Sequence, residues 1–213
     1  MCKICGLTTN DVVYNKISYK KCPNCDFLCK TDEFIVDSKK ECERYQHHDN
    51  DDNNGYLVYQ TNFYEMIKDY LGTTSLDFGC GNNHILANII SKQGIESSYY
   101  DLYFYPNSDY KTKKYDSIIL EEVIEHLYDP IAILKELYPL LNTNGVFIIR
   151  TNLLKDGLNL NNWWYLRDIT HISFFSEKTF VKISEFLNMN IIYCNSKDLI
   201  ILQKVWFLCC YIS

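Results

Sequence analysis

The 213-residue sequence lacks the segments that would assign it to a membrane, to the secretory pathway or to nucleic acid. No apolar run reaches the length of about 18 residues that indicates a transmembrane helix. The opening MCKICG has no basic segment followed by an apolar one, as a signal peptide would. The net charge is −6, whereas proteins that bind nucleic-acid phosphates usually carry a basic face. We therefore expect a cytoplasmic protein without a membrane partner, and nucleic acid is disfavoured as a partner.

The composition also excludes a disordered chain and disfavours a disulfide scaffold. Hydrophobic residues make up 47% and aromatic residues 15% of the sequence, which provides ample apolar surface to bury. The ten cysteines come without an export signal, and this combination is typical of thiols and metal ligands in a reducing compartment. The length allows one full domain with a small appendage.

Four of the cysteines form two closely spaced pairs at the start of the chain. Cys2 and Cys5 make one C-x-x-C pair, and Cys22 and Cys25 make a second one sixteen residues later. Each pair can place two thiolates on one turn, and four thiolates complete the tetrahedral shell of a structural zinc ion. The spacing predicts a zinc-ribbon-like module over residues 1–45. The alternative is four free thiols, or a ribbon that has lost its metal.

A polar stretch, QHHDNDDNNG at residues 46–55, separates this module from the rest of the chain. Asp, Asn and Gly dominate it, so it is expected to be a linker or surface loop. His47 and His48 beside acids could bind metal, but a solvated loop is the favoured interpretation. Apolar residues at helical spacing predict a helix over 56–71, the start of a second domain over 56–213.

The segment TSLDFGCGNNHILANIISKQG predicts a strand, a glycine-rich turn and a helix, the opening unit of a nucleotide-binding α/β fold. Asp77 lies in the strand, and Gly79 and Gly81 form the turn. A third glycine, present in the dinucleotide fingerprint, is missing, which argues against NAD. Asp101 ends the next strand, SSYYDLYF, about 20 residues further on, where an acid can bind both ribose hydroxyls.

The remaining sequence continues the alternation of strands and helices. KYDSIILEE and VFIIRTN predict strands, and between them a helix opens at Asp129 and Pro130 and closes at Asn144-Gly145. SEKTFVKISEFLN predicts a helix with Ser176 as its N-cap. MNIIYCNSKDLIILQKV predicts a hairpin, and the tail VWFLCCYIS is expected to extend its last strand. The fold class is therefore α/β, a mostly parallel sheet with helices on both faces.

Taken together, LDFGCG, YDLYF, YDSIILEEVIEHL and LLNTNGVFIIRTN resemble the successive motifs of class I S-adenosylmethionine-dependent methyltransferases. WWYLRDITHISFFSEKTF, at residues 163–180, resembles a bacterial subfamily with an N-terminal C-x-x-C module. The resemblance runs from Cys2 to about Lys204. It implies a Rossmann-like sheet of seven strands with the last one antiparallel, and S-adenosylmethionine as cofactor.

The resemblance also assigns cofactor contacts by position. Asp101 would bind the ribose hydroxyls, and Leu102 and Tyr103 would flank the adenine. The residues placed around the methionine part and the sulfonium are Asp77, Gly79, Cys80, Gly81 and Glu121. The chain departs from the family between Asp101 and Tyr115, where the third strand and its adenine-binding acid are not recognisable. Asp109 is the sole acid within that gap.

The stretch EEVIEHL places acids and a histidine directly after a buried strand. Glu122, Glu125 and His126 have i, i+3, i+4 spacing, so a helical turn would project all three from one face. Neighbouring carboxylates repel one another, and a divalent cation would offset this cost. Three ligands would leave coordination positions open, as catalytic metal sites do.

E-x-x-E-H is also similar to the metal-binding motif of two methyltransferase groups, the ubiquinone-pathway O-methyltransferases and the small-RNA 3′-end ribose methyltransferases. The second group adds a downstream histidine, and His171 lies where it would fall. The resemblance thus implies a divalent-metal site of Glu122, Glu125, His126 and His171. In the alternative, the acids cap a helix or border the cofactor pocket without metal. Aromatic residues around His171 indicate a loop that covers a substrate pocket.

The function expected from these observations is methyl transfer to an oxygen of a small-molecule acceptor, such as a sugar or another hydroxyl compound, ahead of nitrogen or carbon. His126 or His171 would serve as the catalytic base. Two alternatives remain. One is a nucleic-acid ribose 2′-O-methyltransferase, and the other is a non-catalytic module that binds cofactor or docks onto a partner protein.

Overall fold

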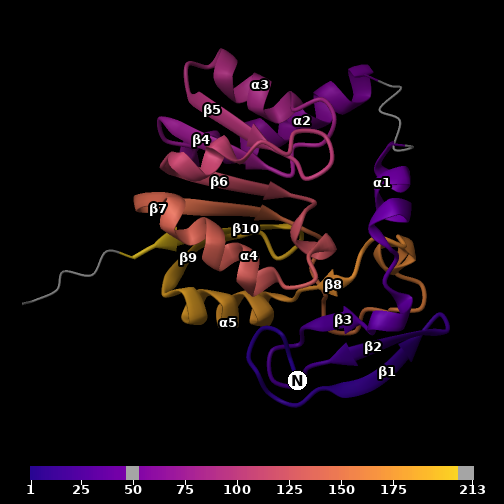
Figure 1. The fold of residues 1–213 in the computed structure, drawn as a ribbon. Helices are drawn as coiled ribbons and strands as arrows, with labels where there is room; N and C mark the ends of the chain where they lie inside the picture. The colour runs from indigo at the N-terminus through magenta and orange to yellow at the C-terminus, as the bar shows by residue number, and fades with distance from the viewer. Residues whose placement is uncertain (47–52, 206–213) are drawn as a thin grey trace, which may run out of the picture.

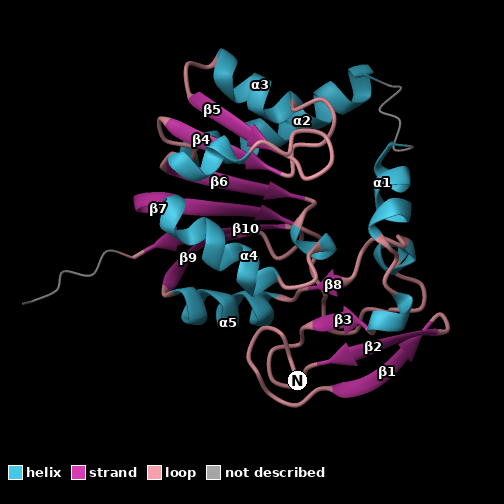
Figure 2. Cartoon of the chain, viewed as in Figure 1, coloured by secondary structure: helices cyan, strands magenta, loops and turns pink. Residues whose placement is uncertain are grey.

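A computed structural model describes residues 1–46 and 53–205. Figures 1 and 2 show a large sheet with helices on both sides and a small N-terminal sheet beside one end of it. His47 and His48 of the predicted linker lie outside the described residues, and so does the tail from residue 206 onward. Within the described ranges, every helix is too short or too polar to cross a lipid bilayer.

The large sheet has the strand order β5-β4-β6-β7-β10-β9. Its first four members pair in parallel, β10 runs antiparallel to β7, and β9 runs antiparallel to β10. The strands are β4 (Thr74–Phe78), β5 (Glu96–Tyr100), β6 (Tyr115–Glu121), β7 (Leu141–Arg150), β9 (Met189–Cys194) and β10 (Leu199–Lys204). The predicted α/β class and the terminal hairpin are confirmed.

Both faces of this sheet are buried, because successive side chains of a strand point to opposite sides. Ile118 and Leu120 of β6 pack into the core on one face, beneath α4 (Pro130–Leu137) and α5 (Glu177–Leu187). Ile119 packs into the core on the other face, beneath two other helices. These are α2 (Asn53–Ile67), which continues as a 3-10 turn η2 (Lys68–Tyr70), and α3 (Ile85–Lys92).

The sheet has six strands within the described residues, where seven were expected. The chain between β5 and β6 forms a tight turn, closed by a bridge between Asp101 and Tyr105, and then the 3-10 turn η3 (Ser108–Thr112). A further parallel strand would need one crossover before it and one after it, each of about a dozen or more residues, whereas residues 101–114 are only 14 residues. This connection is too short for one, so β5 lies at the edge of the sheet.

The predicted helix end at Asn144-Gly145 is also wrong. Helix α4 ends at Leu137, the 3-10 turn η5 (Tyr138–Leu140) follows, and β7 begins at Leu141. Pro139 explains the early end, since proline lacks the N–H that a continuing helix needs. The predicted N-cap of α5 is confirmed, because Ser176 and Thr179 form a reciprocal capping box.

The N-terminal sheet is completed by residues from the far end of the chain. It contains β1 (Asn10–Tyr14), β2 (Ile17–Lys21) and β3 (Leu28–Lys30), and β3 pairs with β8 (Ser173–Phe174). The 3-10 turn η1 (Asp32–Phe34) and helix α1 (Ser38–Gln46) then lead away from the sheet. The module expected over residues 1–45 is therefore hydrogen-bonded directly to the chain that connects β7 with α5.

Candidate active site and cysteine cluster

A cavity of about 860 Å³ lies at the carboxyl ends of β4, β5 and β6, where ligands of open α/β sheets bind. The glycine turn after β4, the Asp101 turn after β5 and the end of β6 form its floor. Helices α1 and α2 and the chain around residues 164–171 supply its walls. The cavity therefore brings together the cofactor motifs and the EEVIEHL stretch.

The glycine turn has a backbone that other residues would not tolerate. Gly79 and Gly81 have φ angles of +87° and +66°, and a Cβ atom on Gly79 would overlap the Val123 side chain. The N–H groups of Gly79 and Cys80 donate to the Tyr100 carbonyl at 2.7 and 3.0 Å. The turn is thus fixed against the end of β5.

Asp101 is fixed by three backbone donors. Its Oδ2 accepts from Gly81 N at 3.0 Å, and its Oδ1 accepts from Tyr103 N at 2.9 Å and Phe104 N at 3.1 Å. A carboxylate accepts about four hydrogen bonds, so capacity remains for a ligand. Leu102 beside it is exposed. The Tyr103 hydroxyl donates to Glu41 of α1 at 2.6 Å, which ties this helix to the cavity rim.

Two acids line the cavity, the buried Asp77 on β4 and the partly buried Glu121 on β6. Burial, and then the charge of Glu121, raise the pKa of Asp77 to about 8. Burial likewise raises the pKa of Glu121 to about 7, against the opposing effects of Gln60 and Arg150. Gln60 Nε2 donates to Glu121 at 2.8 Å, and Arg150 donates at 3.2 Å. Gln60 is not among the site residues predicted from the sequence, although it is a polar residue three positions before the core residue Phe63 on the same helix.

The wall of the cavity formed by the EEVIEHL stretch and residues 164–171 is named the acceptor side. Its EEVIEHL stretch does not form the predicted helical turn. Glu122 has a φ of +51°, and Ile124–His126 form a 3-10 turn, η4. Glu125, His126 and His171 each place one ligand atom within 4.8 Å of the others. Glu122 is not a member of this group. The histidine placed by resemblance thus lies beside Glu125 and His126, whereas Glu122 takes a different position.

Each imidazole of the group is oriented by a backbone carbonyl. His126 Nδ1 lies 3.1 Å from Thr170 O, and His171 Nδ1 lies 2.9 Å from Tyr165 O. Because a carbonyl can only accept, Nδ1 carries the hydrogen, and the neutral ring has its lone pair on Nε2. The two ring centroids are 4.7 Å apart. This tautomer suits both a general base and a metal ligand.

Tyr165, in the 3-10 turn η6 (Trp164–Arg167), links the acids of EEVIEHL. Its hydroxyl lies 3.0 Å from Glu122 Oε2, within hydrogen-bond distance of Glu125 Oε1 and 3.0 Å from Thr151 Oγ1. Burial and the charge of Glu122 raise the pKa of Glu125 well above its usual range. Within the described part of the chain, Glu125 Oε2 is buried without a hydrogen-bond partner. Sequence spacing alone does not identify Tyr165 as a site residue, because its hydrogen-bond partners are distant from it in sequence.

The helix after EEVIEHL is capped by another residue. Asp129 Oδ1 accepts from Ala132 N at 3.0 Å and so caps α4. Glu122 and Glu125 precede this helix and instead contact Tyr165. Helix capping therefore does not explain the two acids.

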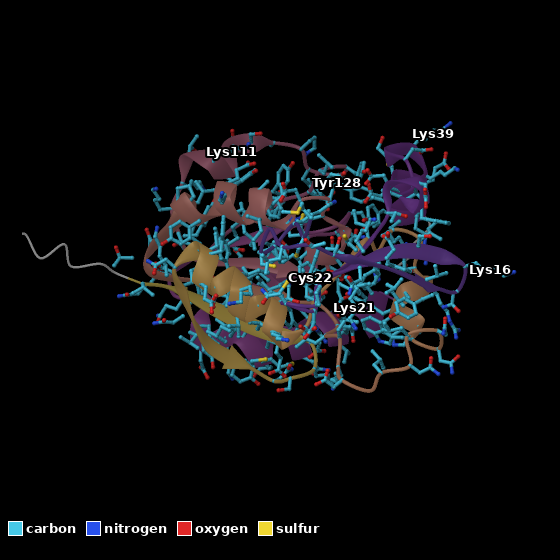
Figure 3. The ribbon with its side chains drawn as sticks, turned by 90° about the horizontal axis from the view of Figure 1, so that it is seen from below. Lys16, Lys21, Cys22, Lys39, Lys111 and Tyr128 are labelled. Atoms are coloured by element: carbon cyan, nitrogen blue, oxygen red, sulfur yellow. The ribbon has the colours of Figure 1, made fainter. Side chains whose placement is uncertain are left out.

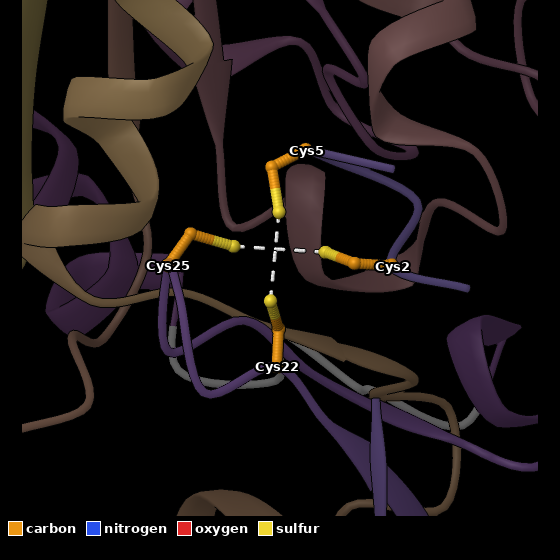
Figure 4. A group of neighbouring side chains, drawn as sticks. All are labelled: Cys2, Cys5, Cys22 and Cys25. Atoms are coloured by element: carbon orange, nitrogen blue, oxygen red, sulfur yellow. Dashed lines mark hydrogen bonds between the residues drawn. The ribbon is translucent and has the colours of Figure 1, made fainter. Parts of the chain in front are cut away.

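The four cysteines of the two C-x-x-C pairs face a common centre, as Figure 4 shows. Sγ of Cys2 lies 3.6 Å from that of Cys25, and Sγ of Cys5 lies 3.5 Å from that of Cys22. Tetrahedral Zn–S bonds of about 2.3 Å would place sulfurs about 3.8 Å apart. The donor set and its spacing therefore fit a zinc ion.

The mixed six-stranded sheet with helices on both faces is similar to methyltransferase folds. A family model described as "Methyltransferase domain" matches residues 41–193, well over half of the chain. The protein belongs to this family and is an S-adenosylmethionine-dependent methyltransferase. The expectation of a non-catalytic module is not retained. Comparison with curated proteins gave no match.

Solved methyltransferases share the fold at low sequence identity. A SAM-dependent methyltransferase from Archaeoglobus fulgidus has a TM-score of 0.52 and 19% identity, over 69% of this chain and 93% of its own. A Burkholderia thailandensis 1,6-didemethyltoxoflavin N1-methyltransferase has a TM-score of 0.53 and 11% identity, over 94% and 100%. Mitomycin 7-O-methyltransferase has a TM-score of 0.53 and 15% identity, and the match spans 76% of this chain and 59% of that enzyme.

Proposed function

We propose that the protein transfers the methyl group of S-adenosylmethionine to a hydroxyl of a small molecule, such as a sugar. The observation that carries this proposal is the shared cavity. Asp101 and the glycine turn border it on one side, and His126 and His171 border it on the other. A cofactor and an acceptor bound there would meet end to end, as in-line displacement at the methyl carbon requires.

The cofactor would lie along the carboxyl ends of the strands. Asp101 on β5 would accept both ribose hydroxyls, with Leu102 and Tyr103 beside the adenine. The methionine part would lie over the glycine turn on β4, and Glu121 on β6 would face the sulfonium. The residues proposed around the methionine part are Asp77, Gly79, Cys80 and Gly81. The resulting order follows the observed strand order β5-β4-β6.

The charge of the cavity supports a small acceptor without phosphate. No lysine or arginine lines the cavity among the described residues, whereas acids such as Asp168 and exposed aromatic residues such as Trp164 do. Figure 3 shows Lys16, Lys39 and Lys111 dispersed at the molecular surface, not gathered into one basic face. These observations disfavour a ribose 2′-O-methyltransferase, which would need to hold a phosphate backbone.

The acceptor hydroxyl would lose its proton to His126 or His171. Each ring is held through Nδ1, so Nε2 is the atom that takes the proton. Transfer of the methyl group then forms the ether bond and breaks the sulfonium bond, leaving S-adenosylhomocysteine. The chain's own contribution is alignment of the two reactants and acceptance of this proton.

Glu125, His126 and His171 also fit a divalent cation, because their donor atoms lie together and Glu125 Oε2 is a buried acceptor with no partner in residues 1–46 and 53–205. Mixed carboxylate and imidazole ligands suit manganese, iron or zinc at least as well as magnesium. Such an ion would lower the pKa of a bound hydroxyl. Glu122, expected among the ligands, would instead position Tyr165.

Binding of S-adenosylhomocysteine, measured by calorimetry, tests the proposed cofactor site. Asp101→Ala should weaken binding by roughly 2–4 kcal/mol, because two hydrogen bonds to a charged acceptor are lost. Asp109→Ala removes a nearby exposed acid and should leave the affinity unchanged. Unchanged affinity in Asp101→Ala would show that the ribose is held elsewhere.

Manganese titration monitored by electron paramagnetic resonance tests the cation site. Glu125→Gln should weaken Mn²⁺ binding at least about tenfold, since even changes in groups that only hydrogen-bond to a metal ligand cost about 10–100-fold. Asp129→Asn is the matched control, because Asn still caps α4. The absence of saturable Mn²⁺ binding in the wild-type protein would leave the histidines as direct bases.

A further inference from the structure

Helix α2 places a buried glutamine at one end of the cavity. Gln60 is 3% exposed and belongs to the cavity lining. Its Nε2 donates to Glu121 Oε2 at 2.8 Å and to the Tyr56 hydroxyl at 3.0 Å. Its carbonyl oxygen Oε1 is buried and has no hydrogen-bond partner among the residues that the structure describes. Both amide hydrogens of Gln60 thus have hydrogen-bond partners, and its carbonyl oxygen can still accept a hydrogen bond.

The orientation of this amide is set by its neighbour. An ionised carboxylate only accepts hydrogen bonds, so the NH₂ group of Gln60 must face Glu121 and the oxygen must face away from it. Buried polar atoms in folded proteins are nearly always partnered, and exceptions call for an explanation. A ligand that brings a donor into the cavity would supply the missing partner.

The surroundings indicate that this donor carries positive charge. Asp77 of β4 pairs with Ile119 of β6, two residues before Glu121, and both acids line the cavity. Arg150 is paired with Glu121 and Asp198, and it is not part of the described lining. An ammonium group offers three donors and no acceptor, which matches a set of buried acceptors.

The strand order shows which part of the cofactor reaches this place. Asp101 follows β5, and Gln60 contacts Glu121 at the end of β6, two strands along the sheet with β4 between them. A ribose held at Asp101 would direct the amino-acid end of the cofactor across the glycine turn toward β6. We propose that Gln60 Oε1 accepts a hydrogen bond from the α-ammonium group of S-adenosylmethionine, beside the carboxyl groups of Asp77 and Glu121, whose ionised forms the positively charged cofactor would favour.

This proposal rests on the proposed function, and it adds α2 to the cofactor site. Two ligands separate the contributions. S-adenosylhomocysteine carries the ammonium group, and 5′-methylthioadenosine shares its nucleoside but lacks the amino-acid group. Calorimetry with both should show that Gln60→Leu weakens S-adenosylhomocysteine binding about 10- to 100-fold, the loss of a hydrogen bond to a charged group. Binding of 5′-methylthioadenosine should change less than about twofold.

Gln60→Asn, which draws the amide back by one methylene, should produce the same selective loss. Thr61→Ala, on the exposed side of α2, is the control and should change neither affinity. Equal weakening of both ligands in Gln60→Leu and Gln60→Asn would mean that Gln60 only supports the helix and would overturn the proposal. Unchanged S-adenosylhomocysteine binding would overturn it too. If the wild-type protein bound neither ligand, the proposed cofactor site itself would fail.

Discussion

At the scale of single residues, the cavity concentrates buried groups that oppose folding when they are charged. Asp77 is 4% exposed, and its ionised form would lose solvation without an ion-pair partner. Glu125 is completely buried beside Glu122. Natural proteins keep buried acids with perturbed pKa values mainly at functional sites. These acids are therefore best understood as groups kept for ligands.

Asp77 makes the stability of the free protein depend on pH. The pKa of Asp77 is about 8 in the folded protein and about 3.9 when unfolded. Between these values the folded state holds a proton that the unfolded state has released, so stability falls as pH rises from about 4 to about 8. Asp77→Asn should reduce this fall by more than about 1 kcal/mol, as one pKa unit corresponds to about 1.4 kcal/mol.

Urea unfolding at pH 5, 6.5 and 8 would measure the effect. Glu121, with a pKa of about 7, should leave a smaller decline of the same sign in the variant. The exposed Asp69 provides the control, since Asp69→Asn should follow the wild-type curve. A wild-type decline that persists in full in Asp77→Asn would contradict the assignment.

At the scale of elements, the chain between β7 and α5 joins the two sheets and carries His171. The buried Lys30 of β3 donates through Nζ to the carbonyls of Asp168 at 3.1 Å and Ile169 at 3.0 Å. The Cys25 carbonyl accepts from the Thr179 hydroxyl at 2.7 Å, at the start of α5. The cysteine module thus contacts the chain segment that carries His171 on the acceptor side of the cavity.

Loss of the proposed zinc ion should therefore loosen the acceptor side as well as the module. Cys22→Ala should remove about one zinc per chain, because a structural site depends on its complete ligand set. Amide hydrogen exchange should then increase both in β3 and over residues 163–176. The core strand β4 should stay protected. Elemental analysis and exchange mass spectrometry provide the two measurements.

Cys29→Ala is the matched control, because Cys29 is also buried in this module but lies outside the four-cysteine group. It should retain zinc and the wild-type exchange over residues 163–176. Wild-type protein without zinc would refute the metal assignment. Increased exchange confined to the module in Cys22→Ala would show that the acceptor side is supported independently.

At the scale of the whole molecule, the sequence was most informative where apolar patterns are long. β6 and β7 are buried on both faces, so they stand out as near-continuous apolar runs. β8 pairs with β3 through two residues, and so short a strand has no readable period. The start of α2 at Asn53 lies inside the predicted linker. It was not predicted, because the Asn and Gly residues there favour turns in isolation.

The residues of the candidate site also differ in how far the sequence alone predicts them. Residues at fixed positions relative to strand ends, such as Gly79, Asp101 and Glu121, could be placed in one cavity from the sequence. Their individual roles remain predictions. Gln60 and Tyr165 approach the site from elements whose positions depend on tertiary packing. Glu122 departs from the predicted helical face because its backbone adopts a left-handed conformation, which no side-chain spacing encodes.

The pairing of β3 with β8 also has a consequence for biosynthesis. All four zinc-spaced cysteines have been synthesised by residue 25, whereas the strand that completes their sheet ends at residue 174. Contacts between distant parts of a chain form late, because a long loop must close first. On the ribosome, the edge strand β3 stays uncovered until the chain has been synthesised as far as residue 174.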